Sequence, residues 1–145
     1  MTIRRPAPAD LVVDTSAVIA VLLDEPSGEA IVRALASAAG ALVSAANVAE
    51  IGIVAEARAG ALGGHHARDL LSAADVTVVP VDATAVAGAL DGWRRFGKGN
   101  HPASLNYGDC FAYALAAHTE LPLLCVGNDF AGTDLQIVDL DRFAD

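Results

Sequence analysis

Four carboxylate side chains occur at positions in the sequence where they could form a metal-binding or catalytic site. Asp14 comes directly after the apolar run "LVV", and Asp129 comes shortly after the run "LLCV". Glu50 and Asp109 each stand three residues after an asparagine, in "NVAE" and "NYGD". Carboxylates gathered at one place repel one another unless a cation offsets their charge. A set of three or four carboxylate oxygens suits Mg²⁺ or Mn²⁺ rather than Zn²⁺.

Each of these carboxylates also has a purely structural interpretation. Asp14 has the residue type and position of an N-cap for the helix that follows. Glu50 and Asp109 have the spacing of capping boxes, and Asp129 could be a turn residue. Taken singly, each residue favours the structural interpretation. Four such residues at strand ends or in first helical turns favour a shared site.

The hydrophobic pattern predicts the elements that would bring these carboxylates together. Short apolar strands are expected at residues 11–13, 42–44, 76–79, 123–126 and 136–138. Helices are expected at residues 18–23, 27–38, 47–58, 65–74, 83–96 and 107–118. Continuous apolar strands that alternate with helices are typical of an α/β fold, a parallel sheet flanked by helices on both faces. Ligand sites in such sheets lie at the carboxyl edge of the strands, so we expect the four carboxylates to meet there.

Composition narrows the classes of protein to which the chain can belong. The chain has 145 residues, of which 54% are hydrophobic. This length and composition predict one domain over 1–145, with residues 1–9 as a leader. Two cysteines without a CxxC spacing argue against a zinc site or a disulfide scaffold. The net charge of −9 opposes non-specific binding of nucleic acid but fits a bound cation. No window is apolar enough for a membrane span, so we expect a cytoplasmic protein without membrane contact.

One short segment is basic within this acidic chain. Arg94, Arg95, Lys98 and His101 crowd together shortly before Asp109. They could complement the negative end of the preceding helix, or they could contact the phosphates of a nucleic acid beside the site. The same segment, "GWRRFGKG", matches part of a P-loop. It lacks both the Ser or Thr after the lysine and the preceding strand, which argues against nucleotide binding there.

Three motifs give the chain a family resemblance. "VVDTSAVIAVLLDEP", "LNYGDCFAYALA" and "LLCVGNDF", with a Glu early in the second α/β unit, resemble the PIN domain, and more narrowly the VapC toxins of type II toxin–antitoxin systems. The resemblance covers residues 11–138. It implies a PIN-like α/β/α sandwich and an endoribonuclease toxin that depends on Mg²⁺ or Mn²⁺. It also implies a homodimer and a cognate antitoxin; for the antitoxin we expect a basic segment that enters the acidic site.

The resemblance also implies roles for particular residues. The acidic quartet of the family maps onto Asp14, Glu50, Asp109 and Asp129 as metal ligands and catalytic residues. Thr15 and Ser16 match the hydroxyl residues that often follow the first aspartate in this family. Together with the basic residues Arg94, Arg95 and Lys98, they become the candidates for contact with RNA phosphates.

Other functions remain open from the residues alone. A non-enzymatic binding module could keep this fold with acids that only cap helices. A phosphatase with an aspartyl nucleophile would need a second aspartate at position 16, where this chain has Ser16. A phosphoacceptor receiver domain would need a lysine after the strand at 123–126, and none follows.

Overall fold

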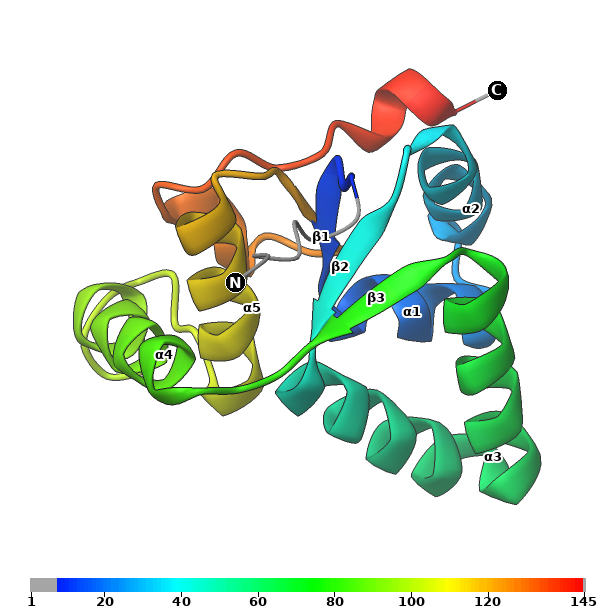
Figure 1. Ribbon diagram of the computed structural model, residues 1–145, viewed down its shortest axis with the longest axis horizontal. Coiled ribbons are helices and arrows are strands. Elements are labelled where there is room, and N and C mark those ends of the chain that lie inside the picture. Colours follow the sequence, from blue (N-terminus) through cyan, green and yellow to red (C-terminus); the bar gives the residue numbers. More distant parts are fainter. Residues whose placement is uncertain (1–7, 145) are drawn as a thin grey trace, which may run out of the picture.

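The computed structural model describes residues 8–144 and contains a parallel four-stranded sheet (Figure 1). The strands run in the order β3-β2-β1-β4, and every neighbouring pair is parallel. Their bounds are β1 (Leu11–Val13), β2 (Ala41–Ser44), β3 (Val76–Val79) and β4 (Leu123–Leu124). The predicted α/β class with a parallel sheet is therefore confirmed. The predicted leader 1–9 lies mostly outside the described residues.

Helices cover both faces of this sheet. Their bounds are α1 (Thr15–Leu22), α2 (Gly28–Ser37), α3 (Ala45–Ala73), α4 (Ala83–Phe96) and α5 (Tyr107–Thr119). Val12 and Val13 are adjacent in β1, so their side chains point to opposite faces. Val13 packs in one buried cluster with Val18 of α1 and Ile51 of α3, whereas Val12 packs in a second cluster with Phe111 of α5. The strands thus have apolar side chains on both faces, as their continuous apolar runs predict.

Two predicted helix starts are wrong, and capping explains both. The helix expected from residue 18 begins at Thr15, because Asp14 accepts a hydrogen bond from the Ser16 amide and caps α1. The helix expected from residue 47 begins at Ala45, because Ser44 is the cap and accepts from the Ala46 amide. Asn47 therefore lies inside the first turn of α3 and is free for another role.

The helices expected at 47–58 and 65–74 form the two halves of α3, which meet at a kink. A local break interrupts α3 at Ala59 and Gly60, where the glycine has a φ of 68° that side-chain-bearing residues rarely adopt. The break changes the direction of the chain, so the second half of α3 can pack beside α1 and the sheet (Figure 1). The first half of α3 therefore ends near Gly60, close to the predicted end of the helix at 47–58.

The carboxyl side of the sheet also differs from the prediction. The strand expected at 123–126 is reduced to β4, because the Val126 amide donates to the Ser16 hydroxyl instead of a neighbouring strand. The strand expected at 136–138 contributes only an isolated parallel bridge between Leu123 and Ile137. Beyond β4 the chain forms a short 3₁₀ helix, η1 (Asp129–Gly132), and a second one, η2 (Leu140–Phe143), lies near the end of the chain.

Helix α4 packs against α5 and leaves one apolar side uncovered. Val86, Leu90 and Trp93 recur along α4 at helical spacing, and each is about 45% exposed. Val78 on the edge strand β3 is similarly exposed. Within residues 8–144 no helix is both long and apolar enough to cross a membrane.

Candidate active site

Asp14 lies at the carboxyl end of β1, and its two oxygens have different environments. Oδ2 accepts hydrogen bonds from the Ser16 amide at 3.0 Å and from the Ser16 hydroxyl at 2.6 Å. Oδ1 is buried and has no hydrogen-bond partner among the described residues. Burial raises the pKa of Asp14, the bonds from Ser16 oppose this, and the charge of Glu50 raises it further. Asp14 is therefore a helix cap with one oxygen left available.

Asp109 lies in the first turn of α5 and shows the same combination. Its Oδ2 accepts from the Asn106 amide at 3.0 Å, while the Asn106 side chain accepts from the Asp109 amide at 2.9 Å. This capping box agrees with the structural interpretation of the sequence. Burial raises the pKa of Asp109 to about 6, helped by the charges of Asp14, Asp129 and Glu50. The three other carboxylates are thus all close enough to act on Asp109.

Glu50 and Asp129 reach this position from two further elements. Glu50 belongs to the second turn of α3, and its carboxylate lies so close to Gly108 that a Cβ added there would overlap it. Asp129 begins η1 and is exposed, while the next residue, Phe130, is buried in the core and anchors the segment. The structure therefore brings the four predicted carboxylates together at the carboxyl edge of the sheet.

The donor set fits a hard divalent cation. Within residues 8–144, none of the four carboxylates forms an ion pair with Lys, Arg or His. In the same part of the chain, no three His, Cys, Asp or Glu side chains are arranged so that together they could hold a metal ion. Mg²⁺ commonly binds through one or two carboxylates and keeps several of its waters, so it does not need three such ligands. The unpartnered Oδ1 of Asp14 is an oxygen donor of the kind Mg²⁺ prefers.

Both hydroxyl residues after Asp14 have partners inside the protein. The Ser16 hydroxyl donates to Asp14 and accepts from the Val126 amide at 2.9 Å, which joins the start of α1 to the segment that leads to Asp129. The Thr15 hydroxyl accepts from the Asn47 side chain at 3.2 Å. Both hydroxyls thus help to hold the site together. Their contact with RNA phosphates stays a prediction.

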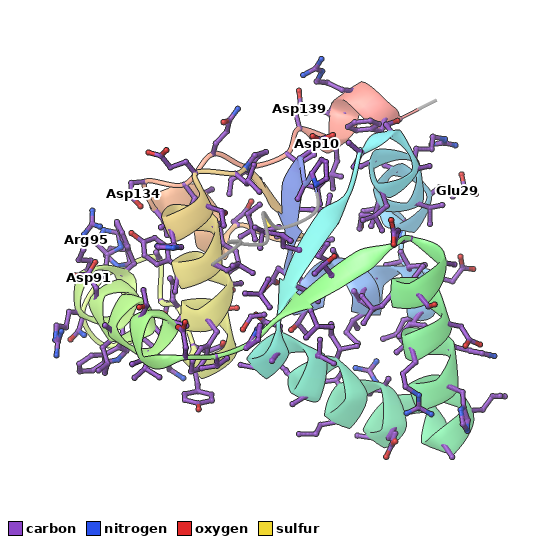
Figure 2. The ribbon with its side chains drawn as sticks, in the orientation of Figure 1. Asp10, Glu29, Asp91, Arg95, Asp134 and Asp139 are labelled. Carbon is purple, nitrogen blue, oxygen red and sulfur yellow. The ribbon has the colours of Figure 1, made fainter. Side chains whose placement is uncertain are left out.

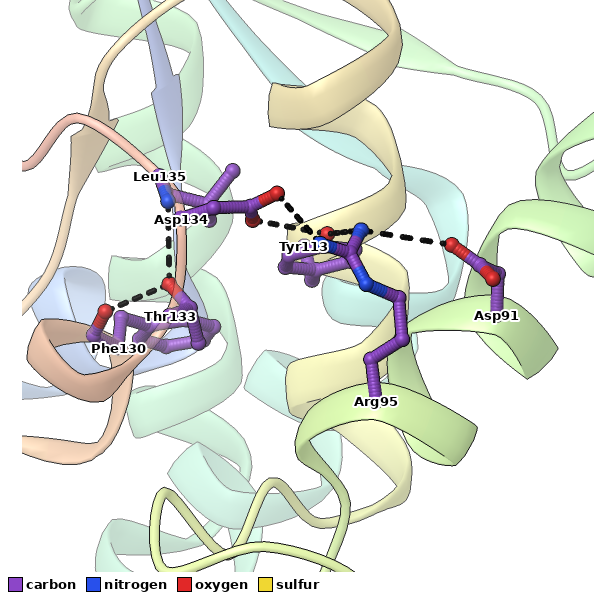
Figure 3. Close-up of polar contacts among 7 residues, drawn as sticks. All are labelled: Asp91, Arg95, Tyr113, Phe130, Thr133, Asp134 and Leu135. Carbon is purple, nitrogen blue, oxygen red and sulfur yellow. Dashed lines mark hydrogen bonds and ion pairs between the residues drawn. The ribbon is translucent and has the colours of Figure 1, made fainter.

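The basic residues divide into two kinds. Arg95 donates to the Tyr113 hydroxyl at 2.9 Å and to Asp134 at 3.0 Å, and it lies 3.7 Å from Asp91 (Figure 3). Tyr113 in turn donates to Asp134 at 2.9 Å. We call Arg95, Tyr113 and Asp134 the clamp, because they join α4, α5 and the segment after η1. The labelled Asp91, Arg95 and Asp134 lie together beside α4 and α5 (Figure 2).

Arg94 and Lys98 differ from Arg95 in having no internal partner. Both are exposed, and neither side chain forms a hydrogen bond or an ion pair with another described residue. These two cations can therefore meet a ligand without breaking an existing contact.

Sequence reasoning missed two residues that shape this site, Asn47 and Gly108. Asn47 is fully buried, and its amide donates to the Gly108 carbonyl as well as to Thr15. The spacing from Asn47 to Glu50 was available as a signal, because residues three apart lie on the same side of a helix. That spacing predicted a helix cap, and Ser44 has that role instead.

Comparisons with known proteins agree with this geometry. Residues 11–135 match the family model of the PIN domain. Ribonuclease VapC30 of Mycobacterium tuberculosis is 43% identical over 130 residues, which cover 90% of this chain and 99% of that protein. Ribonuclease VapC of Mycolicibacterium smegmatis is 44% identical over 128 residues, which cover 88% of this chain and 99% of that protein.

The fold has a solved counterpart as well. The crystal structure of Mycobacterium tuberculosis VapC20, described as a sarcin–ricin loop cleaving toxin, aligns with a TM-score of 0.73 at 18% identity and covers 88% of this chain and 98% of that one. At this identity the likeness shows the fold alone. The family model and the sequence relatives go further, and they show that the chain belongs to the PIN-domain family and, within it, to the VapC ribonucleases, the toxins of toxin–antitoxin systems.

Proposed function

We propose that this chain is an endoribonuclease that hydrolyses RNA phosphodiester bonds at a Mg²⁺ or Mn²⁺ site formed by Asp14, Glu50, Asp109 and Asp129. One observation carries the assignment: the buried Oδ1 of Asp14 has no hydrogen-bond partner, and the charges of Glu50 and Asp109 lie close enough to interact with this carboxylate. A cation would satisfy that oxygen and offset the mutual repulsion of the four charges.

The residues of the site have separable tasks in this reaction. When bound, a divalent ion supplies an activated water and stabilises the leaving oxygen. Asp14 offers Oδ1 while Ser16 fixes the orientation of its carboxylate. Asp109 must lose its proton before it can bind the ion, and its raised pKa makes binding weaken below about pH 6. Asp129 is exposed, so its carboxylate is accessible to a substrate.

The substrate we propose is single-stranded or loop RNA. Proteins that read RNA sequence mostly bind exposed bases, because the deep groove of an RNA duplex is closed to side chains. The printed description of VapC20 as a toxin that cleaves the sarcin–ricin loop supports a loop as substrate. Arg94 and Lys98 would contact phosphates beside the site, whereas the guanidinium of Arg95 is held within the clamp.

The test is incubation of the purified protein with total RNA, with EDTA, with Mg²⁺ and with Mn²⁺, followed by mapping of the cut ends. We expect discrete cuts in unpaired RNA that need the metal. RNA that stays intact at every Mg²⁺ and Mn²⁺ concentration would contradict the proposal. Cuts that persist in EDTA would contradict the role of the metal. The variant Asp14→Asn serves as the control for a contaminating nuclease.

We also propose two protein partners. One structural neighbour is a toxin–antitoxin complex from Klebsiella pneumoniae, with a TM-score of 0.66 at 16% identity over 90% of this chain and 97% of that one. An antitoxin with an arginine-bearing segment would fit here, since a guanidinium can pair with carboxylates bidentately where the cation would bind. A second copy of the chain would cover the exposed apolar side of α4, including Leu90 and Trp93. We also propose that the protein acts in the cytoplasm, where RNA substrates would be available.

A further inference from the structure

Asn47 lies beneath the carboxyl edge of the sheet and is completely buried. Its side-chain nitrogen donates to the Thr15 hydroxyl at 3.2 Å and to the Gly108 carbonyl at 3.1 Å. A carbonyl oxygen can only accept, so the nitrogen and not the oxygen of the amide must face Gly108. The orientation of this side chain is therefore determined by its surroundings.

The two partners of Asn47 are the chain neighbours of two site carboxylates. Thr15 follows Asp14 directly, and Gly108 precedes Asp109 directly. Asn47 itself lies one helical turn before Glu50 on α3. A single amide thus connects the three segments that carry Asp14, Glu50 and Asp109.

Gly108, in the first turn of α5, lies against two residues of α3, Asn47 and Glu50. Asn47 donates to its carbonyl, and the Glu50 carboxylate occupies the space that a Cβ at this position would need. The distance between Glu50 and Asp109 is therefore tied to the contact between α3 and α5, which the Asn47 hydrogen bond maintains.

The free oxygen of Asn47 shows that packing alone does not explain the residue. Its Oδ1 is buried and has no hydrogen-bond partner among the described residues. A buried acceptor without a donor costs free energy, and an apolar side chain of similar shape would avoid that cost. The two hydrogen bonds of the nitrogen, which join the acid-bearing segments, are the feature that such an apolar side chain could not supply.

We propose that Asn47 is a positioning residue of the metal site, and that it acts through Thr15 and Gly108 to fix the segments that carry Asp14, Glu50 and Asp109 relative to one another. The inference rests on the proposed function of the four carboxylates as metal ligands. Like-charged groups drift apart unless the structure around them is fixed, and residues that orient metal ligands typically contribute 10–100-fold to metal affinity.

The experiment compares Mn²⁺ affinities of purified, EDTA-treated variants by titrating the metal and following thermal unfolding, without RNA. Thr15→Val removes the acceptor hydroxyl and keeps the shape of the side chain, while Thr15→Ser restores the hydroxyl. We expect Thr15→Val to weaken Mn²⁺ binding several-fold and Thr15→Ser to bind nearly as the wild type does. Asn47→Leu, which loses both hydrogen bonds, should weaken binding by roughly 10-fold or more.

The outcomes separate this inference from the proposed function. A wild type that binds Mn²⁺ and cleaves RNA, with Thr15→Val and Asn47→Leu at wild-type affinity, would overturn the positioning role and leave the metal site intact. A wild type without any Mn²⁺ response would overturn both. If Asn47→Leu fails to fold, Thr15→Val against Thr15→Ser decides the question. A direct contact of Thr15 with RNA would leave Mn²⁺ affinity unchanged in both Thr15 variants.

Discussion

Two groups of carboxylates in this molecule differ in whether the protein itself offsets their negative charge. In the clamp, Asp134 accepts hydrogen bonds from Tyr113 and Arg95. Although its partial burial acts in the other direction, these contacts hold the pKa of Asp134 below its ordinary value. At the edge of the sheet, burial and neighbouring charges raise the pKa of both Asp14 and Asp109.

Helix α5 contributes to both groups, which makes the contrast direct. Asp109 and Tyr113 lie one helical turn apart on the same helix. At Tyr113 the protein provides its own cation, Arg95, whereas no described Lys, Arg or His pairs with Asp109 or its three neighbours. The clamp thus has its own protein cation and the four carboxylates have none, which agrees with the proposal that they bind a metal ion.

The largest effect is expected from Asp14→Asn. Asparagine caps helices about as well as aspartate, so α1 should keep its start. Removing one of several close negative charges should leave metal-free stability unchanged or raise it by up to roughly 1–2 kcal/mol after solvent screening. The variant should lose stabilisation by Mn²⁺, and RNA cleavage should fall by orders of magnitude. Thermal unfolding in EDTA and in excess Mn²⁺, beside a cleavage assay, measures both.

Asp134→Asn is the matched control from the clamp. It also removes one negative charge from an aspartate, but that charge already has a protein cation beside it. We expect this variant to keep the Mn²⁺-induced rise in unfolding temperature and to keep cleavage. If Asp14→Asn also kept both, Asp14 would be a helix cap and nothing more.

A smaller effect on the free energy of unfolding is expected from a change of pH, because Asp109 titrates. Its pKa of about 6 in the folded protein exceeds the ordinary value of 3.8, so the folded state binds the proton more tightly than the unfolded state does. The resulting stability is complete below about pH 4 and is lost as the pH rises through 6. In EDTA, wild type should lose about 1–3 kcal/mol over this range relative to Asp109→Asn.

The comparison with Asp109→Asn isolates this titration, since asparagine can still accept from the Asn106 amide in the capping box. With Mn²⁺ the trend of the wild type should reverse, because protons and metal compete for the same oxygens. Denaturant unfolding from pH 4 to 7, with and without Mn²⁺, gives both curves. Parallel curves for wild type and variant in EDTA would mean that burial and the neighbouring charges do not raise the pKa of Asp109.

The strands and most helices could be predicted because hydrophobic pattern alone defines them. Leu11–Val13, Val76–Val79 and Ala83–Phe96 have the predicted bounds. The errors lie at ends set by single hydrogen bonds. Asp14 and Ser44 lengthen two helices at their starts, and the hydroxyl of Ser16 ends β4 early. Apolar periodicity carries no information about such contacts.

The four carboxylates could be predicted because parallel strands bring their carboxyl ends to one edge. The capping and metal-site interpretations of Asp14 looked like alternatives in the sequence. In the structure the capping interpretation holds for one oxygen, Oδ2, and leaves Oδ1 for the other role. The part played by Asn47 could not be predicted, because its partners lie 32 and 61 residues away along the chain.

The smallest effect on stability is expected from substitution of two adjacent arginines, Arg94 and Arg95. Arg95 belongs to the clamp, whereas its neighbour Arg94 is exposed and without an internal partner. We expect Arg95→Gln to lower the unfolding temperature by a few degrees at most, and less in high salt, since exposed ion pairs contribute little and are screened. Arg94→Gln should leave the unfolding temperature unchanged.

RNA binding should show the opposite order for the same two variants. In the inactive Asp14→Asn background, Arg94→Gln should weaken RNA binding. The slope of the logarithm of the binding constant against the logarithm of the salt concentration should become shallower by about one, because one phosphate contact is lost. Arg95→Gln should change neither, since its guanidinium is held by Asp134 and Tyr113. Binding titrations across a range of salt concentrations measure both slopes. A larger loss of RNA affinity for Arg95→Gln than for Arg94→Gln would show that the clamp opens to bind phosphate. The proposed distinction between the two arginines would then be wrong.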